Sequence, residues 1–449
     1  MFTHYWRFML RVIDYFKDDW QQIFLEDITN RKSYPVHLLP IINDINNRYL
    51  YWSKAKHFAK QAGVEEKTLW AYVKDERSTE RVVIPIIENE NTRKFTFNTP
   101  NKFNELLYMI DHEYQALNKK ISEPKFQQFK RYSISSLMEE AIASSQIEGA
   151  STTRKVAKEM LRTGRKPANY HEQMILNGYL TIRNIKNNIH KPLNIDLVTE
   201  IHNELIKNTS EFLKADDFTI RENRVEIENN FKVVFRAPEP EICVKSLNKL
   251  ISYANAETDN FFVHPIIKAI ILHFWFAYIH PFYDGNGRTA RILFFWHLLK
   301  KGYYLFEYIP LSMEIKKNRK NYEDAFLHVE HDENDLNYFI LYNLRTILKA
   351  IKGFHKYIDN KNKEIEKIQD YLSASNLNIR QLVLINNSIK NEKAVYTLKS
   401  HMQCHDISRP IATKDLEELV KRNFFEKIAE RKQHYYVPID NLRSLILKD

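Results

Sequence analysis

Twelve consecutive residues combine the groups that phosphate chemistry needs. The segment from His280 to Arg291 has the sequence His-Pro-Phe-Tyr-Asp-Gly-Asn-Gly-Arg-Thr-Ala-Arg. It holds one potential general base, one carboxylate, two arginines and two of the 8 glycines in the chain. A histidine can take a proton from an alcohol near neutral pH, and a carboxylate can hold Mg²⁺ beside bound phosphates. The segment therefore predicts a phosphate site with a base and a metal-binding carboxylate beside it.

The elements on either side must position these groups. The apolar run from Ile266 to Ile279 predicts a buried helix that Pro281 ends, and the run from Thr289 to Leu299 predicts a second helix. The tight loop Gly285-Asn286-Gly287 between them leads into a helix N-terminus. Free N–H groups and the helix dipole attract anions at such a position.

The two arginines are spaced to act together. Arg288 and Arg291 are three residues apart, so both can contact one anion from the same helix face. His280 precedes the loop and Asp284 lies between the base and the arginines. A lone histidine after an apolar helix is usually a packing or capping residue, but the complete loop beside it favours a catalytic role.

The segment resembles the signature of the Fic family, His-x-Phe-x-Asp/Glu-Gly-Asn-Gly-Arg-x-x-Arg, and fills every fixed position. Fic proteins are mostly helical enzymes that typically transfer AMP from ATP to a Ser, Thr or Tyr hydroxyl of a target protein. The resemblance implies that His280 is the base and that Asp284 holds Mg²⁺ on the α and β phosphates. It implies phosphate-binding roles for the loop and the arginines that follow, namely Gly285, Asn286, Gly287, Arg288 and, for the γ-phosphate, Arg291.

A second segment, Ser144-Ser145-Gln146-Ile147-Glu148-Gly149, resembles the inhibitory motif of the family, Ser/Thr-x-x-x-Glu-Gly/Asn. The resemblance implies that Glu148 pairs with Arg291, where it occupies the place of the γ-phosphate and repels it. Ser144 is expected to hydrogen-bond locally and hold an inhibitory helix around residues 140–150. Because the motif precedes the signature, the chain resembles the class with an N-terminal inhibitory helix. The alternative is a plain helix end, with Gly149 as the residue after it.

Two β-prone runs around Glu228-Asn229-Asn230 predict a hairpin within residues 219–236. Family members carry a hairpin flap here, which implies that a target protein docks along it by main-chain pairing and that Ile227 lies against the nucleotide. An ordinary surface hairpin is the alternative. Tyr322 falls where many relatives have Tyr-Tyr near the adenosine, but Asn321 replaces the first tyrosine. Other Fic members transfer UMP or phosphocholine, and ATP is the expected substrate here.

Composition agrees with a large soluble protein, and the resemblance to Fic proteins implies a mainly α fold. At 449 residues the chain is expected to form two or three domains, and 44% hydrophobic residues can fill a sizeable core. We expect no membrane span, because no run of about 18 uncharged apolar residues is present. No signal peptide is recognisable and the 2 cysteines are far apart, which fits a cytoplasmic location. The run from His328 to Glu333 is expected to be a solvated helix end rather than a metal site.

The chain is expected to divide into four parts. Residues 1–105 form an α(+β) N-terminal extension, whose first 45 residues the sequence does not place, and residues 106–345 form the Fic core. Residues 346–372 form a linker helix. Residues 373–449 resemble a winged helix-turn-helix domain, with helices opening near Leu377 and Thr397, a turn and recognition helix over His405–Leu416, and a wing over Glu426–Val437.

The partners of the C-terminal domain stay open at this point. The net charge of +10 is scattered over Lys/Asn-rich helices, and the C-terminal domain has only a small positive excess. DNA, a docked protein or a second copy in a homodimer are the candidates. Three functions follow: an AMP transferase autoinhibited by Glu148, a DNA-binding regulator whose Fic core senses nucleotide, or an enzyme that removes AMP with Glu148 orienting a water.

Overall fold

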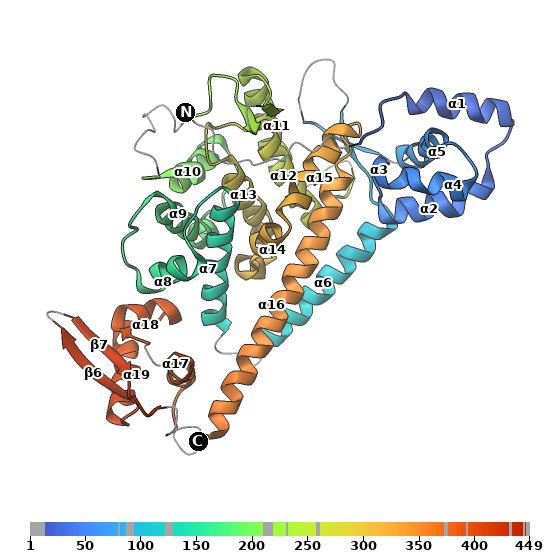
Figure 1. Ribbon diagram of the computed structural model, residues 1–449. Helices are drawn as coiled ribbons and strands as arrows, with labels where there is room; N and C mark the ends of the chain where they lie inside the picture. Colours follow the sequence, from blue (N-terminus) through green and yellow to red (C-terminus); the bar gives the residue numbers. More distant parts are fainter. Residues whose placement is uncertain are drawn as a thin grey trace.

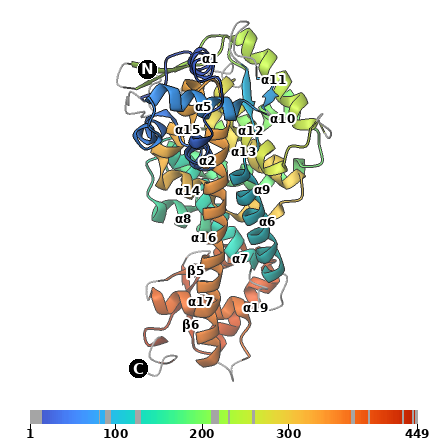
Figure 2. The same ribbon diagram turned by 90° about the vertical axis from the view of Figure 1, so that its right-hand side faces the viewer.

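The computed structural model describes residues 14–79, 81–86, 94–121, 129–209, 219–229, 232–256, 261–371, 376–391, 394–430, 433–442 and 445. Over these residues the fold is mainly helical, as expected, and the strands form three small antiparallel sheets. Figures 1 and 2 show an N-terminal module and a C-terminal module at opposite ends of two long helices, α6 and α16, with the helical core beside them.

The N-terminal module begins within the residues that the sequence did not place. Its helices are α1 (Trp20–Arg31), α2 (Leu39–Arg48), α3 (Trp52–Ala55), α4 (Ala59–Ala62) and α5 (Glu66–Ser78), with 3-10 turns at Val36–Leu38 and Lys56–Phe58. Strands β1 (Val82–Ile84) and β2 (Phe95–Phe97) follow and pair antiparallel. The helices enclose a core of their own around the fully buried Trp70.

The core contains the remaining helices up to residue 371. In chain order they are α6 (Asn101–Ile121), α7 (Phe129–Ile147), α8 (Arg154–Thr163), α9 (Tyr170–Asn184), a 3-10 turn (Ile185–Asn188), α10 (Ile195–Ile206), α11 (Pro240–Asn255), α12 (Pro265–Ile279), α13 (Asn286–Lys300), a 3-10 turn (Tyr304–Tyr308), α14 (Leu311–Lys317), α15 (Arg319–His331) and α16 (Asn337–Tyr371). Between α10 and α11 a hairpin of β3 (Glu226–Asn229) and β4 (Lys232–Arg236) confirms the predicted hairpin.

Helices α12 and α13 pack against each other at the centre of the core, and nearly all their residues are buried. This confirms the two helices predicted around the signature. Helix α13 begins at Asn286, three residues earlier than expected, because Gly285 at its N-cap takes a left-handed backbone with φ +78°. A Cβ at Gly285 would lie 3.0 Å from the Ile206 side chain, so the position has no room for a larger residue.

Helices α6 and α16 run side by side in the same direction (Figure 1). They are joined just past their midpoints, where His355 contacts Glu113 at 3.0 Å, and Lys120 pairs with Asp359 further along. The expected boundaries at 105 and 345 both fall inside these helices. The linker helix expected over 346–372 is therefore the second part of a helix that starts in the core at Asn337, where an apolar face keeps it packed.

The C-terminal module contains three helices and one sheet. They are α17 (Ile379–Lys390), β5 (Tyr396–Thr397), α18 (Leu398–His405), α19 (Arg409–Lys421), β6 (Phe425–Glu430) and β7 (Gln433–Pro438), with strand order β5-β7-β6. Reciprocal capping boxes start α17 at Asn378 and α18 at Thr397, close to the predicted positions. Helix α18 packs against α7 and α8 of the core. No helix among the described residues is long and apolar enough to span a membrane.

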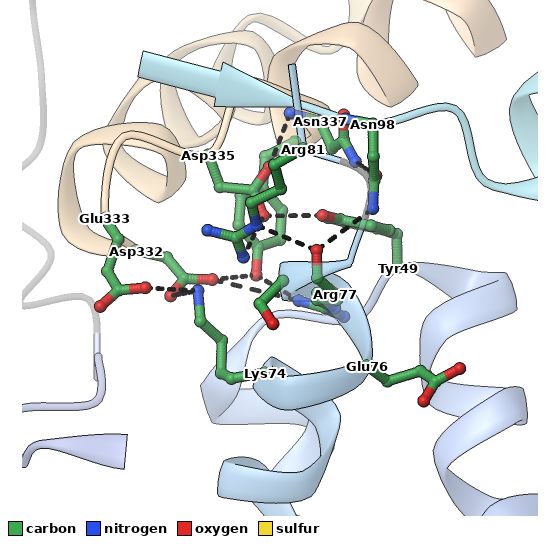
Figure 3. A network of polar contacts seen from close by, with 12 residues as sticks. Tyr49, Lys74, Glu76, Arg77, Arg81, Asn98, Asp332, Glu333, Asp335 and Asn337 are labelled. Carbon is green, nitrogen blue, oxygen red and sulfur yellow. Dashed lines mark hydrogen bonds and ion pairs between the residues drawn. The ribbon is translucent and has the colours of Figure 1, made fainter. Parts of the chain in front are cut away.

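A buried polar network fastens the N-terminal module to the core (Figure 3). Lys74 of α5 is fully buried and binds Asp332 at 2.8 Å and Glu333 at 3.2 Å. Arg77 donates to the Tyr338 hydroxyl at 2.8 Å. The run ending at Glu333 does close a helix, but the expectation that it is solvated is wrong, because its carboxylates face the cations of α5. Within the described residues no group of three or more His, Cys, Asp or Glu could hold a metal.

We expect Lys74→Met to lower the free energy of unfolding by about 3 kcal/mol, because Asp332 and Glu333 would keep their partly buried charges without that cation. The measurement is urea unfolding followed by tryptophan fluorescence. Lys67→Met is the matched control, because Lys67 pairs with Asp18 at the surface and its loss should cost under about 1 kcal/mol. Equal effects of the two substitutions would contradict the assignment.

Candidate active site

The site is built around the turn between α12 and α13. His280 ends α12 in a left-handed conformation with φ +50°, and its N–H bonds back to the Phe276 carbonyl. Its side chain is buried, and Nδ1 lies 3.2 Å from the Ala277 carbonyl oxygen. Because a carbonyl only accepts, this contact places the proton on Nδ1 and leaves the lone pair on Nε2. Burial lowers the pKa of His280 to about 4, so the ring is neutral at neutral pH.

The loop before α13 is closed by an asparagine side chain. Asn286 accepts from the Phe282 N–H at 3.0 Å and donates to the Phe282 carbonyl at 2.6 Å. Both ends of its amide are thus used inside the loop, and the side chain is almost fully buried. The structure places Asn286 as a loop-closing residue. The first-turn N–H groups of α13 remain as the anion-binding part of this loop.

Asp284 and Arg288 face each other across the same turn. An Asp284 carboxylate oxygen lies 3.2 Å from Arg288 Nη2, and the other accepts from the Gly285 N–H at 2.6 Å. Arg288 also donates to the Leu205 carbonyl at 2.9 Å, which ties the loop to the end of α10. The Asp284 side chain is 48% exposed, so the carboxylate is open to a ligand from solvent.

Arg291 is held from the opposite side by the end of α7. Its Nη2 lies 2.8 Å from a Glu148 carboxylate oxygen and 3.1 Å from the Ser144 carbonyl. Its Nε donates to the Ser144 hydroxyl at 2.9 Å. The expected contact between Glu148 and Arg291 is therefore present. Ser144 is expected from the sequence to bond locally, and its hydroxyl and carbonyl also accept from the guanidinium across 147 positions of sequence.

The Glu148 carboxylate lies directly on the first turn of α13. A Cβ built on Gly287 would be 2.2 Å from Glu148 Oε1, which explains why this position needs a glycine when Glu148 is in place. Gly149 follows with φ +96° and its N–H bonds to the Gln146 carbonyl, so Gly149 also ends the helix as the alternative interpretation had it. The two interpretations are compatible, because the helix end delivers the carboxylate.

Two buried arginine nitrogens at this place have no hydrogen-bond partner in the part of the chain that the structure describes. They are Arg288 Nε and Arg291 Nη1. Buried donors are rarely left unpaired, because each costs about 1–3 kcal/mol. Two orphaned guanidinium donors beside a helix N-terminus are the groups that phosphate oxygens would satisfy.

A second buried carboxylate anchors α7. Glu140 accepts from the Ser312 N–H at 2.7 Å and from the Ser312 hydroxyl at 2.5 Å, at the start of α14. Burial raises the pKa of Glu140 to about 7. Ser144 and Glu148 follow Glu140 at intervals of four residues, so all three lie on one face of the helix and its end. No sequence motif distinguishes Glu140 from its neighbours.

The hairpin packs on Tyr278 of α12, whereas Tyr322 is buried within the core. In β3 the backbone of Ile227 pairs with Phe235, whose ring packs on Tyr278 at 5.4 Å, while the Ile227 side chain lies outside the described part. The Tyr322 ring is fully buried in the core and its hydroxyl bonds to His273 at 3.0 Å. The ring lies near Arg291 and has no open surface.

Two residues that the sequence did not single out bond to main-chain carbonyls of the turn. His202 stacks on Phe282 with ring centroids 3.6 Å apart, and its Nε2 donates to the Asp284 carbonyl at 2.8 Å. Burial lowers the pKa of His202 to about 4. Arg221, just before the hairpin, is 1% exposed and bonds to carbonyls around His280. Neither residue lies in a recognisable motif, so only their tertiary neighbours reveal them.

The profile of the Fic/DOC family matches residues 192–298, which contain the turn, both arginines and α13. Residues 192–298 thus match a Fic domain. A protein adenylyltransferase fic-1 of Caenorhabditis elegans is 28% identical over 153 residues, which are 34% of this chain and 27% of that relative. A protein adenylyltransferase Fic of Culex quinquefasciatus is 35% identical over 94 residues, which are 21% of this chain and 17% of that relative. The matched part thus spans less than a third of these relatives.

Among solved structures, a Fic family protein from Desulfovibrio desulfuricans aligns over 75% of this chain and 95% of its own, with 17% identity and a TM-score of 0.48. The match to the family profile ends at residue 298, before α14 and the C-terminal module. Glu148 and Ser144 precede the start of that match, so the link between α7 and the Fic domain comes from the contacts of this structure.

We expect stability to fall as pH drops from about 6.5 towards 4, in part through His202. Its folded pKa lies below the unfolded value, so the unfolded state binds more protons in this window and gains free energy as pH falls. The contribution is about 2 kcal/mol between pH 6.5 and 4.5. Glu140 acts in the opposite sense, because its pKa is raised and its stabilising effect is lost as pH rises through about 7.

Comparison of the wild type with His202→Gln isolates the contribution of His202 to the pH dependence of stability. Denaturant unfolding at pH 7.0 and 4.5 should show a smaller loss of stability for the variant between the two pH values. His37→Gln, on a turn of the N-terminal module away from this site, is the control and should follow the wild type. An unchanged pH dependence in His202→Gln would show that the ring is not held neutral by the fold.

Proposed function

We propose that the chain is a protein adenylyltransferase, which moves AMP from ATP to a hydroxyl group of a target protein and is autoinhibited by Glu148. The observation that carries this is the Glu148 carboxylate seated on the first turn of α13 and paired with Arg291 at 2.8 Å. A site that binds a carboxylate in this way, with two further orphaned guanidinium donors, is suited to a polyphosphate.

His280 is the proposed base. Its Nε2 holds the lone pair, and the neutral ring can take the proton of the target hydroxyl. The hydroxyl oxygen then forms a bond to the α-phosphorus of ATP, the bond from that phosphorus to the bridging oxygen breaks, and pyrophosphate leaves. Transfer of this kind depends mostly on positioning and on neutralising charge, which the buried arginines and the α13 N-terminus supply.

Asp284 is the proposed Mg²⁺ ligand. Mg²⁺ is commonly held by one or two carboxylates together with substrate phosphates, so a single half-exposed carboxylate beside the phosphate site fits it. The ion would neutralise phosphate charge when bound. Asp284 would hold the ion from beside Arg288, whose Nη2 lies 3.2 Å from the same carboxylate and whose Nε would face the phosphate oxygens.

Autoinhibition follows from competition for one cation. Arg291 Nη2 cannot bind the Glu148 carboxylate and a γ-phosphate oxygen at the same place, and the two anions repel each other. Removal of Glu148 leaves the buried guanidinium with Ser144 and an open anion site. Relief of inhibition in the intact protein therefore requires the end of α7 to move away from α13.

The remaining proposals concern partners. The target protein docks along the hairpin of β3 and β4 by main-chain pairing. The helix and strand order of residues 376–442 supports a winged-helix assignment for the C-terminal module. We favour a protein partner for this module, because Glu417 and Glu418 on α19 reduce the positive charge that would neutralise DNA phosphates.

Glu148→Gly should raise label transfer from α-labelled ATP with Mg²⁺ at least about 10-fold, because the anion site becomes free. Glu148→Gly/His280→Ala should lose that gain by about 10²–10⁴-fold, because the base is gone. The measurement is label on the protein itself or on added lysate. Glu65→Gly, an exposed N-cap position where glycine is tolerated, is the control and should match the wild type.

Two results would contradict this reading. Transfer that persists in the double variant would remove His280 as the base. Release of AMP from a labelled target by the wild type, with loss of release in Glu148→Gly, would make the protein an enzyme that removes AMP.

Ser312→Ala should raise basal transfer by about 5-fold, a smaller gain than Glu148→Gly. It removes one of the two Ser312 donors to Glu140, which costs about 1 kcal/mol in the anchoring of α7. Ser252→Ala is the matched control, since Ser252 bonds only within its own exposed helix surface. Unchanged transfer in Ser312→Ala would mean that the start of α14 does not restrain the inhibitory helix.

A further inference from the structure

Arg221 is a buried cation that donates hydrogen bonds to several main-chain oxygens. It lies just before the β3–β4 hairpin and is 1% exposed. Its Nε donates to the His280 carbonyl at 2.7 Å, and its Nη2 donates to the Ile279 carbonyl at 3.3 Å and the Pro238 carbonyl at 2.5 Å. Its Nη1 donates to the Asn223 carbonyl at 2.9 Å.

These acceptors belong to three segments that must move together if the guanidinium stays in place. Ile279 and His280 close α12, Asn223 leads into the hairpin, and Pro238 follows it. The main-chain N–H of Arg221 adds a bond to the Pro281 carbonyl at 2.9 Å. One side chain thus joins both stems of the hairpin to the residue that carries the imidazole.

The physical need for a cation here comes from the helix end. The last carbonyls of a helix have no intrahelical partner and carry the negative end of its dipole. His280 is also left-handed, a conformation that a non-glycine residue holds only when its surroundings enforce it. The planar fork of an arginine can satisfy several carbonyls in fixed directions, which the single ammonium of a lysine cannot.

The nearest acidic group on this side does not neutralise Arg221. Glu239 pairs instead with Arg224 at 2.8 Å on the surface. The Cys243 thiol packs beside the guanidinium, and burial raises the pKa of that thiol to about 11, so it stays neutral. The charged groups that face His280 are Arg221, which lowers its pKa, and Glu148 and Asp284, which raise it.

We propose that Arg221 is the positioning residue of this active site, which fixes the backbone and ring of His280 relative to the hairpin. The inference rests on the proposed function for its catalytic consequence. It makes the hairpin and the base one rigid unit, so a target segment paired with the hairpin presents its hydroxyl to Nε2 at a set distance. A role in positioning predicts a loss in turnover rather than in nucleotide affinity.

The kinetic test uses the Glu148→Gly protein as the active background. Addition of Arg221→Met should lower kcat at least about 30-fold while KM for ATP changes less than about 3-fold. Arg221→Lys keeps the charge without the fork and should lose at least about 5-fold in kcat. The matched controls are Arg48→Met and Arg48→Lys, which break an exposed pair with Asp44 in the N-terminal module and should keep kcat within about 2-fold.

A second test measures the His280 pKa and amide hydrogen exchange, which do not depend on AMP transfer. NMR of the protein with labelled histidines should show a higher His280 pKa in Arg221→Met than in the wild type, because a nearby positive charge is removed. Amide hydrogen exchange at residues 279–283 and 222–225 should speed up at least about 10-fold in both Arg221 variants, and exchange in α9 should not change. The ring signal of His280 is assigned from its loss in His280→Ala.

The outcomes distinguish the proposed adenylyltransferase function from the positioning role of Arg221. No transfer in any variant, together with faster exchange and a raised His280 pKa, would overturn the proposed function and support the positioning role. Arg221→Lys with wild-type exchange and kcat would overturn the positioning role while the transferase stands. If Arg221→Met unfolds, Arg221→Lys decides, because a folded variant with unchanged exchange at 279–283 is incompatible with the proposal.

Discussion

The buried pair between Arg291 and Glu148 is the interaction on which the site depends. Arg291 is 2% exposed in its side chain and sits beside the positive end of α13, where a bare guanidinium would be costly to bury. Ser144 supplies neutral acceptors and Glu148 supplies the opposite charge. Any state that lets Glu148 leave must offer another anion to the same place. This requirement holds the end of α7 against the first turn of α13, and under the proposed function a phosphate would meet it in place of Glu148.

Several helices and contacts around this pair restrain the turn between α12 and α13 and the end of α7. Helices α12 and α13 are buried on nearly every side, so their turn is held by the core rather than by its own loop. Glu140 and Ser312 restrain α7 farther from the pair, and α18 of the C-terminal module packs on the same helix. A partner that moves the C-terminal module would therefore act on the helix that carries Glu148. The N-terminal module is fastened separately, through the network around Lys74.

The differences between expectation and structure have a common cause. Asp332 and Glu333 look solvated in the sequence because they close a polar helix, yet the buried Lys74 of α5 lies against their carboxylates. The helix expected from 346 starts at Asn337, because its first turns are covered by the core. Ser144 bonds to Arg291 from far along the chain. In each case a partner distant in sequence overrides the local pattern.

The sequence by itself determined the signature loop, the two helices around it, the hairpin and the order of helices and strands in the C-terminal module. These rest on local periodicity, glycines and caps, which act over a few residues. Only the tertiary structure decided that Asn286 closes the loop, that Tyr322 is buried, and that His202, Arg221 and Glu140 support the site. Such roles depend on which side chains meet across long separations, and no periodicity in a single sequence encodes those distances.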